Sequence, residues 1–127
     1  MRDSRPLIER ICDYVSKLDT ELGVERAYLF GSTAKRNRRK NSDVDLIIVS
    51  KAFIGMPIPK REGTLENLWD YCEDLEALAY TPEEFAKISQ RLTMKEILSY
   101  AVDLTPAILA KKEENRQAHA VSFSYSQ

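Results

Sequence analysis

Residues 24–49 read VERAYLFGSTAKRNRRKNSDVDLIIV, and this stretch decides the fold. It holds two runs rich in β-branched, aliphatic and aromatic residues, 24–30 and 44–49, which predict two strands. The second run is apolar on both faces, as is typical of a central strand that is covered on both sides. Gly31-Ser32 ends the first strand, and Asp43-Val44-Asp45 opens the second.

The two aspartates form the first candidate site. Residues i and i+2 of a strand point to the same face, so Asp43 and Asp45 project together, with α-carbons roughly 7 Å apart. Mg²⁺ prefers carboxylate oxygens and commonly binds one or two of them plus substrate phosphates. A bare pair of this kind is more often a strand cap and a solvated residue. The metal interpretation gains weight from the preceding Gly31-Ser32, where a backbone can approach a phosphate closely.

A third acid is predicted on a later strand, at 75–80. Asp74 and Glu76 fall on one face of it, and Asp74 is expected to end the preceding loop. Glu76 is flanked by apolar residues, so we expect it to lie deeper in the strand. A carboxylate there is costly unless it is paired or bound to a metal. Glu76 is therefore the candidate that completes a metal site with the two aspartates.

The flanking sequence predicts one compact α/β domain. An apolar stripe at helical spacing predicts a helix over 5–22, which Gly23 ends. Glycines and prolines over 51–63 indicate a loop. The remaining expected elements are a helix over 65–72, a helix that Thr81 and Pro82 begin, a helical pattern over 97–102 and a helix over 105–118. We expect a single domain over 1–121 and a flexible tail over 122–127.

Composition excludes several classes of function. The 127 residues suit one soluble domain, and the net charge of -1 does not indicate a globally basic nucleic-acid binder. The longest apolar runs have four residues, whereas a bilayer span needs about 20, so no membrane segment is expected. The N-terminus has no apolar signal core, so we expect a cytoplasmic protein. Two cysteines without a CxxC spacing and a single histidine, His119, disfavour a zinc site.

A basic run lies between the two halves of the candidate site. Five of the six residues over 35–40 are lysine or arginine. Three interpretations stay open: contact with a triphosphate, contact with a nucleic acid or an acidic partner, and a solvated loop.

Gly31-Ser32, ten intervening residues and Asp43-Val44-Asp45 together resemble the signature of the polymerase-beta-like nucleotidyltransferases. The stretch LEALAYTPEEF over 75–85 is similar to the strand and helix that bear the third acid of that family. The length and order of elements are similar to the minimal nucleotidyltransferases, which are often encoded beside a HEPN-domain partner. The resemblance covers residues 5–105 and implies a small mixed α/β sheet flanked by helices.

The resemblance also implies an activity, namely Mg²⁺-dependent transfer of a nucleoside monophosphate from an NTP, with ATP as the expected donor and pyrophosphate leaving. The acceptor that it implies is a tyrosine on a HEPN toxin, which would make this chain an antitoxin. The residues that would bind the triphosphate are Gly31, Ser32, Arg39 and Ser42. The residues that would bind one or two Mg²⁺ ions and serve catalysis are Asp43, Asp45 and Glu76, with Glu76 a candidate acceptor of the hydroxyl proton.

The chain departs from the family pattern at two positions. Arg36 stands where a glycine is common, and Glu76 stands where the third acid is often aspartate. Two other functions therefore stay open. One is a non-catalytic module that neutralises its partner by contact, and the other is transfer to a small molecule such as an aminoglycoside. The sequence leaves open which NTP is used and whether the chain forms an oligomer.

Overall fold

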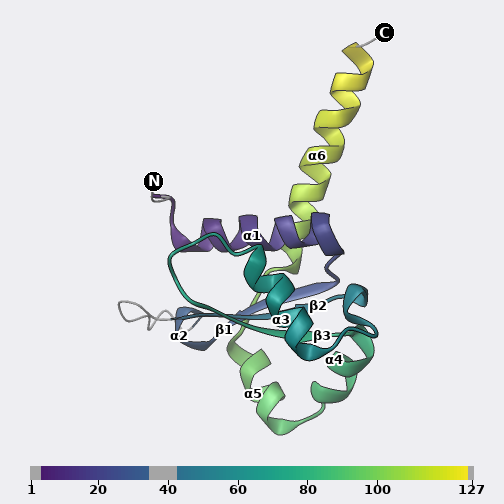
Figure 1. The fold of residues 1–127 in the computed structure, drawn as a ribbon. Helices are drawn as coiled ribbons and strands as arrows, with labels where there is room; N and C mark the ends of the chain where they lie inside the picture. Colours follow the sequence, from purple (N-terminus) through teal and green to yellow (C-terminus); the bar gives the residue numbers. More distant parts are fainter. Residues whose placement is uncertain (1–3, 35–42, 126–127) are drawn as a thin grey trace.

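The computed structural model describes residues 4–34 and 43–125, apart from the side chains of Ser32, Thr33, Asn115 and 117–125. Helices are interspersed with strands along the chain, as expected for an α/β domain (Figure 1). The elements in chain order are α1 Leu7–Leu22, β1 Arg26–Phe30, α2 Gly31–Ala34, β2 Val44–Val49, the 3₁₀ turn η1 Lys51–Phe53, α3 Ile58–Asn67, β3 Leu75–Tyr80, α4 Pro82–Ile88, α5 Leu92–Tyr100, β4 Val102–Asp103 and α6 Thr105–Tyr125.

The four strands form one mixed sheet in the order β3-β2-β1-β4. Strand β2 pairs antiparallel with β1 and parallel with β3. Parallel neighbours need a crossover connection, which here runs through η1 and α3. Strand β2 is therefore internal and β3 is an edge strand, and both of these positions matter for the site.

Both faces of β2 are covered, as its sequence predicts. Val44, Leu46 and Ile48 are fully buried in a core that includes α1 residues, Leu65 of α3 and Ile108 of α6. Ile47 and Val49 point the other way, into a smaller cluster with residues of α4 and α5. Figure 1 shows α1 on one side of the sheet and α5 on the other. The hydrophobic strand is thus the centre of a three-layer arrangement.

The first helix and the start of the fourth confirm the sequence predictions. Helix α1 buries four residues of its apolar stripe and ends at Gly23, where φ is +78°. At α4, the Thr81 hydroxyl accepts from the Glu84 N–H, and the Glu84 carboxylate accepts from the Thr81 N–H. This reciprocal pair is a capping box, and Pro82 occupies the first turn.

The connection between β2 and β3 differs from the prediction. A loop over 51–63 was expected, followed by a helix over 65–72, but α3 already begins at Ile58 and ends at Asn67. Pro57 and Pro59 do not break this helix, because they occupy the N-cap and the first turn, where a missing N–H costs nothing. The prolines thus mark the start of the helix and not a loop.

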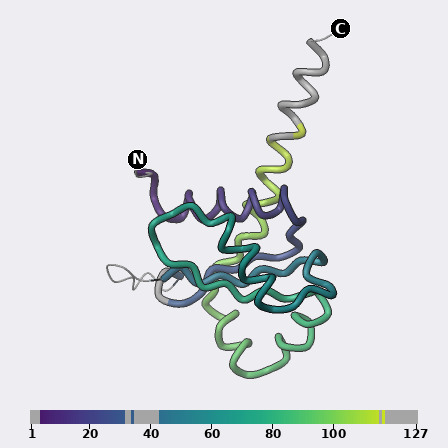
Figure 2. The backbone as a smooth tube through the Cα atoms, viewed as in Figure 1, coloured from purple at the N-terminus to yellow at the C-terminus, as the bar shows by residue number. Residues whose placement is uncertain are grey.

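The C-terminal part also departs from the prediction. The helical pattern over 97–102 is wrong at its end, because α5 stops at Tyr100 and Val102 joins β4, which pairs with β1. Helix α6 continues beyond the predicted end at residue 118, as far as Tyr125. Its first turns pack beside α1, as the backbone trace in Figure 2 shows. None of the helices in the described part of the chain is long and apolar enough to span a bilayer.

Candidate active site

Asp45 and Glu76 lie side by side on neighbouring strands. The parallel register of β2 and β3 places Asp45 directly opposite Glu76. Paired residues of parallel strands point to the same face, and the strands are roughly 4.8 Å apart. The two carboxyl groups are close enough for Glu76 to raise the pKa of Asp45 through hydrogen bonding and charge. Residues 31 positions apart in the sequence therefore meet at one end of the sheet, as the family resemblance implies.

The pKa of Asp45 is raised from its ordinary value of 3.8 to about 6. Loss of hydration through burial is the main cause, followed by the hydrogen bond with Glu76 and by repulsion from the Glu76 and Asp43 carboxylates. Asp43 immediately precedes β2, two residues from Asp45, and is half-buried. Three acidic side chains thus concentrate negative charge where the sequence predicts a cation.

Gly31 forms the wall of the site next to Asp45. Its φ is +71°, a conformation that favours glycine, and Phe30 just before it pairs with Asp45 across the β1–β2 ladder. A Cβ added to Gly31 would collide with the Asp45 Oδ2 and lie 3.0 Å from its Cγ. The glycine is therefore needed twice, once for the backbone turn and once for the space that the Asp45 carboxylate occupies.

The structure corrects the expected surroundings of Glu76. The sequence predicts a carboxylate enclosed within the strand, but Glu76 is exposed. The reason is topological: β3 is an edge strand, and its first residues are not covered on the face that carries Glu76. Glu76 also lines a cavity of about 270 Å³ together with Glu62 and Glu66 of α3. The site is consequently open to solvent on the β3 side.

These acids fit a Mg²⁺ ion whose shell is completed by a nucleotide. Among the described residues, no three acidic, histidine or cysteine side chains converge closely enough to form a complete metal site. The Asp45–Glu76 pair still places two carboxylates next to each other, with Asp43 close enough to raise the Asp45 pKa further. Mg²⁺ commonly takes one or two protein carboxylates plus phosphate oxygens and water. The donor set therefore suits an ion that arrives with its substrate.

Part of the predicted triphosphate site cannot be placed. Arg39 and Ser42, like the basic run over 35–40, lie outside the described residues. Ser32 belongs to the short helix α2, but its side chain is among those not described. Of the four predicted triphosphate contacts, Gly31 alone is fully placed, and it adjoins Asp45.

A salt bridge that the sequence analysis missed holds the start of β3. The Arg10 guanidinium of α1 binds the Glu73 carboxylate through two nitrogen–oxygen contacts of 2.8 and 3.0 Å. Both side chains are nearly buried, and the Arg10 hydrogen bond lowers the pKa of Glu73. The next residue, Asp74, accepts a hydrogen bond at its carbonyl from the Val44 N–H. These contacts fix the approach to Glu76, but their separation in sequence leaves no local signal.

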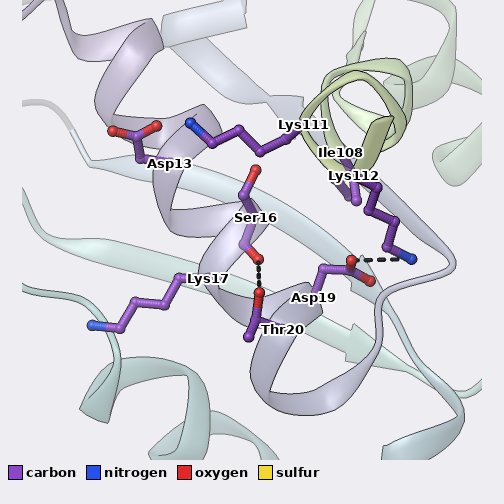
Figure 3. A pocket seen from close by; sticks show the side chains of 8 residues that line it. All are labelled: Asp13, Ser16, Lys17, Asp19, Thr20, Ile108, Lys111 and Lys112. Carbon is purple, nitrogen blue, oxygen red and sulfur yellow. Dashed lines mark hydrogen bonds and ion pairs between the residues drawn. The ribbon is translucent and has the colours of Figure 1, made fainter. Parts of the chain in front are cut away.

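A second hollow lies away from the acids, between α1 and α6 (Figure 3). It has a volume of about 290 Å³ and a polar lining. At its edge Lys112 of α6 pairs with Asp19 of α1 at 3.1 Å, and Asp19 also accepts from the Val24 N–H at 2.8 Å. The Asp19 side chain is only 6 % exposed. We interpret this hollow as part of the junction between α1 and α6, because its lining includes none of the candidate active-site residues that the structure describes.

Comparison with known proteins gives one family match and several similar solved structures. The family model described as polymerase beta, nucleotidyltransferase matches residues 10–114. A Sulfolobus solfataricus crystal structure described as a candidate nucleotidyltransferase is similar at 20 % identity and a TM-score of 0.46, over 68 % of this chain and 84 % of that one. A toxin–antitoxin crystal structure with AMP-PNP is similar at 14 % identity and a TM-score of 0.42, over 91 % and 98 %.

No protein with a curated description matches the sequence. The family match spans most of the chain and includes β1, β2, β3 and the three acidic residues of the site. It therefore covers the whole of the candidate site. The chain belongs to the polymerase beta nucleotidyltransferase family.

Proposed function

We propose that this chain is an active nucleotidyltransferase that transfers a nucleoside monophosphate, AMP from ATP, to a hydroxyl on a partner protein. The observation that carries the proposal is the in-register Asp45–Glu76 pair next to Gly31. Partial burial of Asp45 next to Glu76 raises the pKa of Asp45, and a group perturbed in this way beside a second acid is typical of functional sites.

The chemistry follows from phosphoryl transfer. The acceptor oxygen forms a bond to the α-phosphorus, the bond from that phosphorus to the bridging oxygen of pyrophosphate breaks, and pyrophosphate leaves. Glu76, the exposed member of the pair, accepts the hydroxyl proton. Asp43 and Asp45 would hold Mg²⁺, and the ion would supply neutralisation of the phosphate charge during transfer. Gly31 lets the backbone approach the triphosphate.

The resemblance to minimal nucleotidyltransferases suggests the acceptor, a tyrosine on a HEPN toxin, and a role as antitoxin in the cytoplasm. The openness of the site on the Glu76 side supports a macromolecular acceptor, because a protruding side chain can reach the acids there without a lid.

The test is transfer of labelled nucleotide. The protein is incubated with Mg²⁺, each of the four α-labelled NTPs and the product of the adjacent gene. We expect label on that protein with ATP, and loss of labelling in Asp43→Asn with Asp45→Asn. Absence of labelling with all four NTPs, or equal labelling by the double variant, would contradict the proposal.

One observation favours a second candidate, a non-catalytic antitoxin that acts by contact. The described acids do not by themselves complete a three-ligand metal site. Under this alternative, the variant with Asp43, Asp45 and Glu76 all changed to amides would still form a complex with the partner and silence it. Silencing that needs both the acids and ATP would favour the enzyme.

A further inference from the structure

The free edge of β3 runs from the acid site to the opposite end of the sheet. The Val44 N–H donates to the Asp74 carbonyl and the Ser50 N–H donates to the Tyr80 carbonyl. In a parallel ladder, backbone groups of alternate residues face the partner strand, so even-numbered residues of β3 face β2. The N–H and C=O groups of Leu75, Ala77 and Ala79 therefore face outward. This leaves an edge on which another strand could pair.

Few side chains of the described chain occupy this edge. Arg61 Nη1 donates to the Ala79 carbonyl at 3.2 Å, and Trp69 Nε1 donates to the Glu73 carbonyl at 2.6 Å. Both contacts lie towards the ends of the strand, so the middle is left open. The common devices that block an edge, such as a proline or a lysine in the strand, are missing from the sequence LEALAY of β3.

Two cavities follow the edge in succession. The first, of about 270 Å³, is lined by residues 75–78 of β3 and by α3. The second, of about 330 Å³, is lined by Ala79 and Tyr80 together with α3, α4 and Arg91. Exposed apolar side chains accompany them, with Leu78 39 % exposed and Ile58 59 % exposed. An added strand presents side chains to both faces of a sheet, and these hollows provide room for them.

The charges along the edge change sign from one end to the other. Glu62 and Glu66, both exposed on α3, join Glu76 around the first cavity. Lys87 and Arg91, also exposed, line the second cavity. An extended segment with a basic residue at one end and an acidic residue at the other would match both ends.

We propose that the free edge of β3 is where an extended segment of the acceptor protein docks, added as a further strand with its basic end beside Glu62 and Glu66 and its acidic end beside Lys87 and Arg91. The identification of the docked segment as part of the acceptor protein rests on the proposed function. Docking of this kind would deliver an acceptor hydroxyl at the Glu76 end of the strand. Main-chain hydrogen bonds would supply affinity, and the two charged ends would supply direction.

The experiment measures docking without nucleotide or Mg²⁺. Two fluorescent peptides share an alternating Val-Thr core, one with Glu-Glu before and Arg-Arg after the core and the other with the charges exchanged, so that both strand directions are sampled. By fluorescence anisotropy with the full-length chain, we expect one peptide to bind with a Kd on the order of 10–100 µM. We expect binding to weaken about tenfold in Ala77→Pro, which removes an outward N–H, and to persist in Ala77→Val.

Two further measurements keep the result interpretable. N-methylation of alternate peptide amides blocks strand pairing without touching the protein, so it gives the same answer even if Ala77→Pro fails to fold. Charge reversal in Lys87→Glu with Arg91→Glu should weaken the better peptide at low salt and leave the melting temperature nearly unchanged, because both positions are exposed.

The outcomes separate this proposal from the proposed function. Absence of binding by both peptides, or equal binding of the N-methylated form, overturns the docking edge even if nucleotide transfer is observed. Peptide binding that Ala77→Pro abolishes supports the edge even if transfer fails. A dimer of the chain by light scattering that Ala77→Pro converts to a monomer would assign the edge to a second copy and overturn the acceptor proposal.

Discussion

Asp45 and Glu76 face each other across the parallel strands β2 and β3, and their proximity contributes to the raised pKa of Asp45. Burial, then the neighbouring Glu76 and Asp43, raises the pKa of Asp45 to about 6, so Asp45 takes up a proton at a higher pH than an ordinary aspartate. The pair is therefore a compact acid site whose charge depends on pH and on any bound cation.

The first prediction concerns pH and metal binding. Below about pH 6 Asp45 becomes protonated, and a neutral carboxyl is a poor Mg²⁺ ligand. We expect calorimetric binding of Mg²⁺ with a non-hydrolysable ATP analogue to weaken as the pH falls from about 7 to about 5. Asp45→Asn should abolish most of the Mg²⁺ binding, and the binding that remains should no longer depend on pH. Binding that stays constant across this range would contradict the assignment of Asp45.

The second prediction concerns the stability cost of the acid pair. The folded-state pKa of Asp45, about 6, lies above its ordinary value of 3.8, so folding takes up a proton between these values and the charged form destabilises the fold at higher pH. In buffer with EDTA, Asp45→Asn should raise the Tm at about pH 8 and have little effect at about pH 4. Added Mg²⁺ with nucleotide should reduce the difference in Tm between the variant and the wild type, because it stabilises the wild type. A lower Tm of the variant at pH 8 would refute this account.

The third prediction separates the two reasons for Gly31. Gly31→Ala should destabilise the fold by about 1–3 kcal/mol and abolish nucleotide binding, because both backbone strain and a collision with Asp45 result. Gly55→Ala is the matched control, since its φ of +77° is nearly the same and a Cβ there meets nothing within 4 Å. Chemical denaturation should show a larger loss at Gly31, and equal losses would remove the role of the Asp45 contact.

The fourth prediction concerns the capping box of α4. The Arg61 hydrogen bond, then the Thr81 N–H, lowers the pKa of Glu84 to about 2. A lowered pKa contributes stability above the ordinary value of 4.5, and this contribution is lost as the pH falls through about 2. Because the Glu84 side chain is 46 % exposed, Glu84→Gln should cost only about 1 kcal/mol at pH 7 and nothing at about pH 2. Glu83→Gln, on the same helix, is the control and should change the free energy of unfolding little at either pH.

The fifth prediction tests the junction of α1 and α6. Asp19 is nearly buried and accepts from both Val24 and Lys112, so Asp19→Ala should cost about 1–3 kcal/mol through an unsatisfied N–H. Lys112→Ala should cost less than about 1 kcal/mol, because that side chain is 53 % exposed. Urea denaturation of both variants gives the comparison. A larger loss for the lysine variant would mean that the ion pair, and not the bond to Val24, holds this corner.

The sequence predicts the parts of this fold that depend on local pattern. Strand β2 is recognisable because Val44–Val49 is apolar on both faces, and the start of α4 because Thr81 and Pro82 are favoured at the N-cap and first turn. Helix α3 was displaced in the prediction because Pro57 and Pro59 are compatible with both a loop and a helix start. Only packing, here the burial of Leu65, decides between the two.

The candidate site also has a part that the sequence predicts and a part that it does not. That Asp43, Asp45 and Gly31 lie close together follows from their spacing within one stretch of chain. The exposure of Glu76 depends on which strand lies at the edge, and no local pattern encodes strand order. The Arg10–Glu73 bridge joins residues 63 positions apart, beyond the reach of any periodicity.

The parallel pairing of β2 and β3 also orders the events of folding. Strands β1 and β2 are antiparallel and close in sequence, whereas Glu76 reaches Asp45 only after the whole crossover from Ser50 to Asp74 has closed its long loop. We therefore expect the acid pair to form late along the folding pathway. A nucleotide and cation bound there would stabilise contacts absent from the transition state, so they should slow unfolding and leave the rate of folding nearly unchanged.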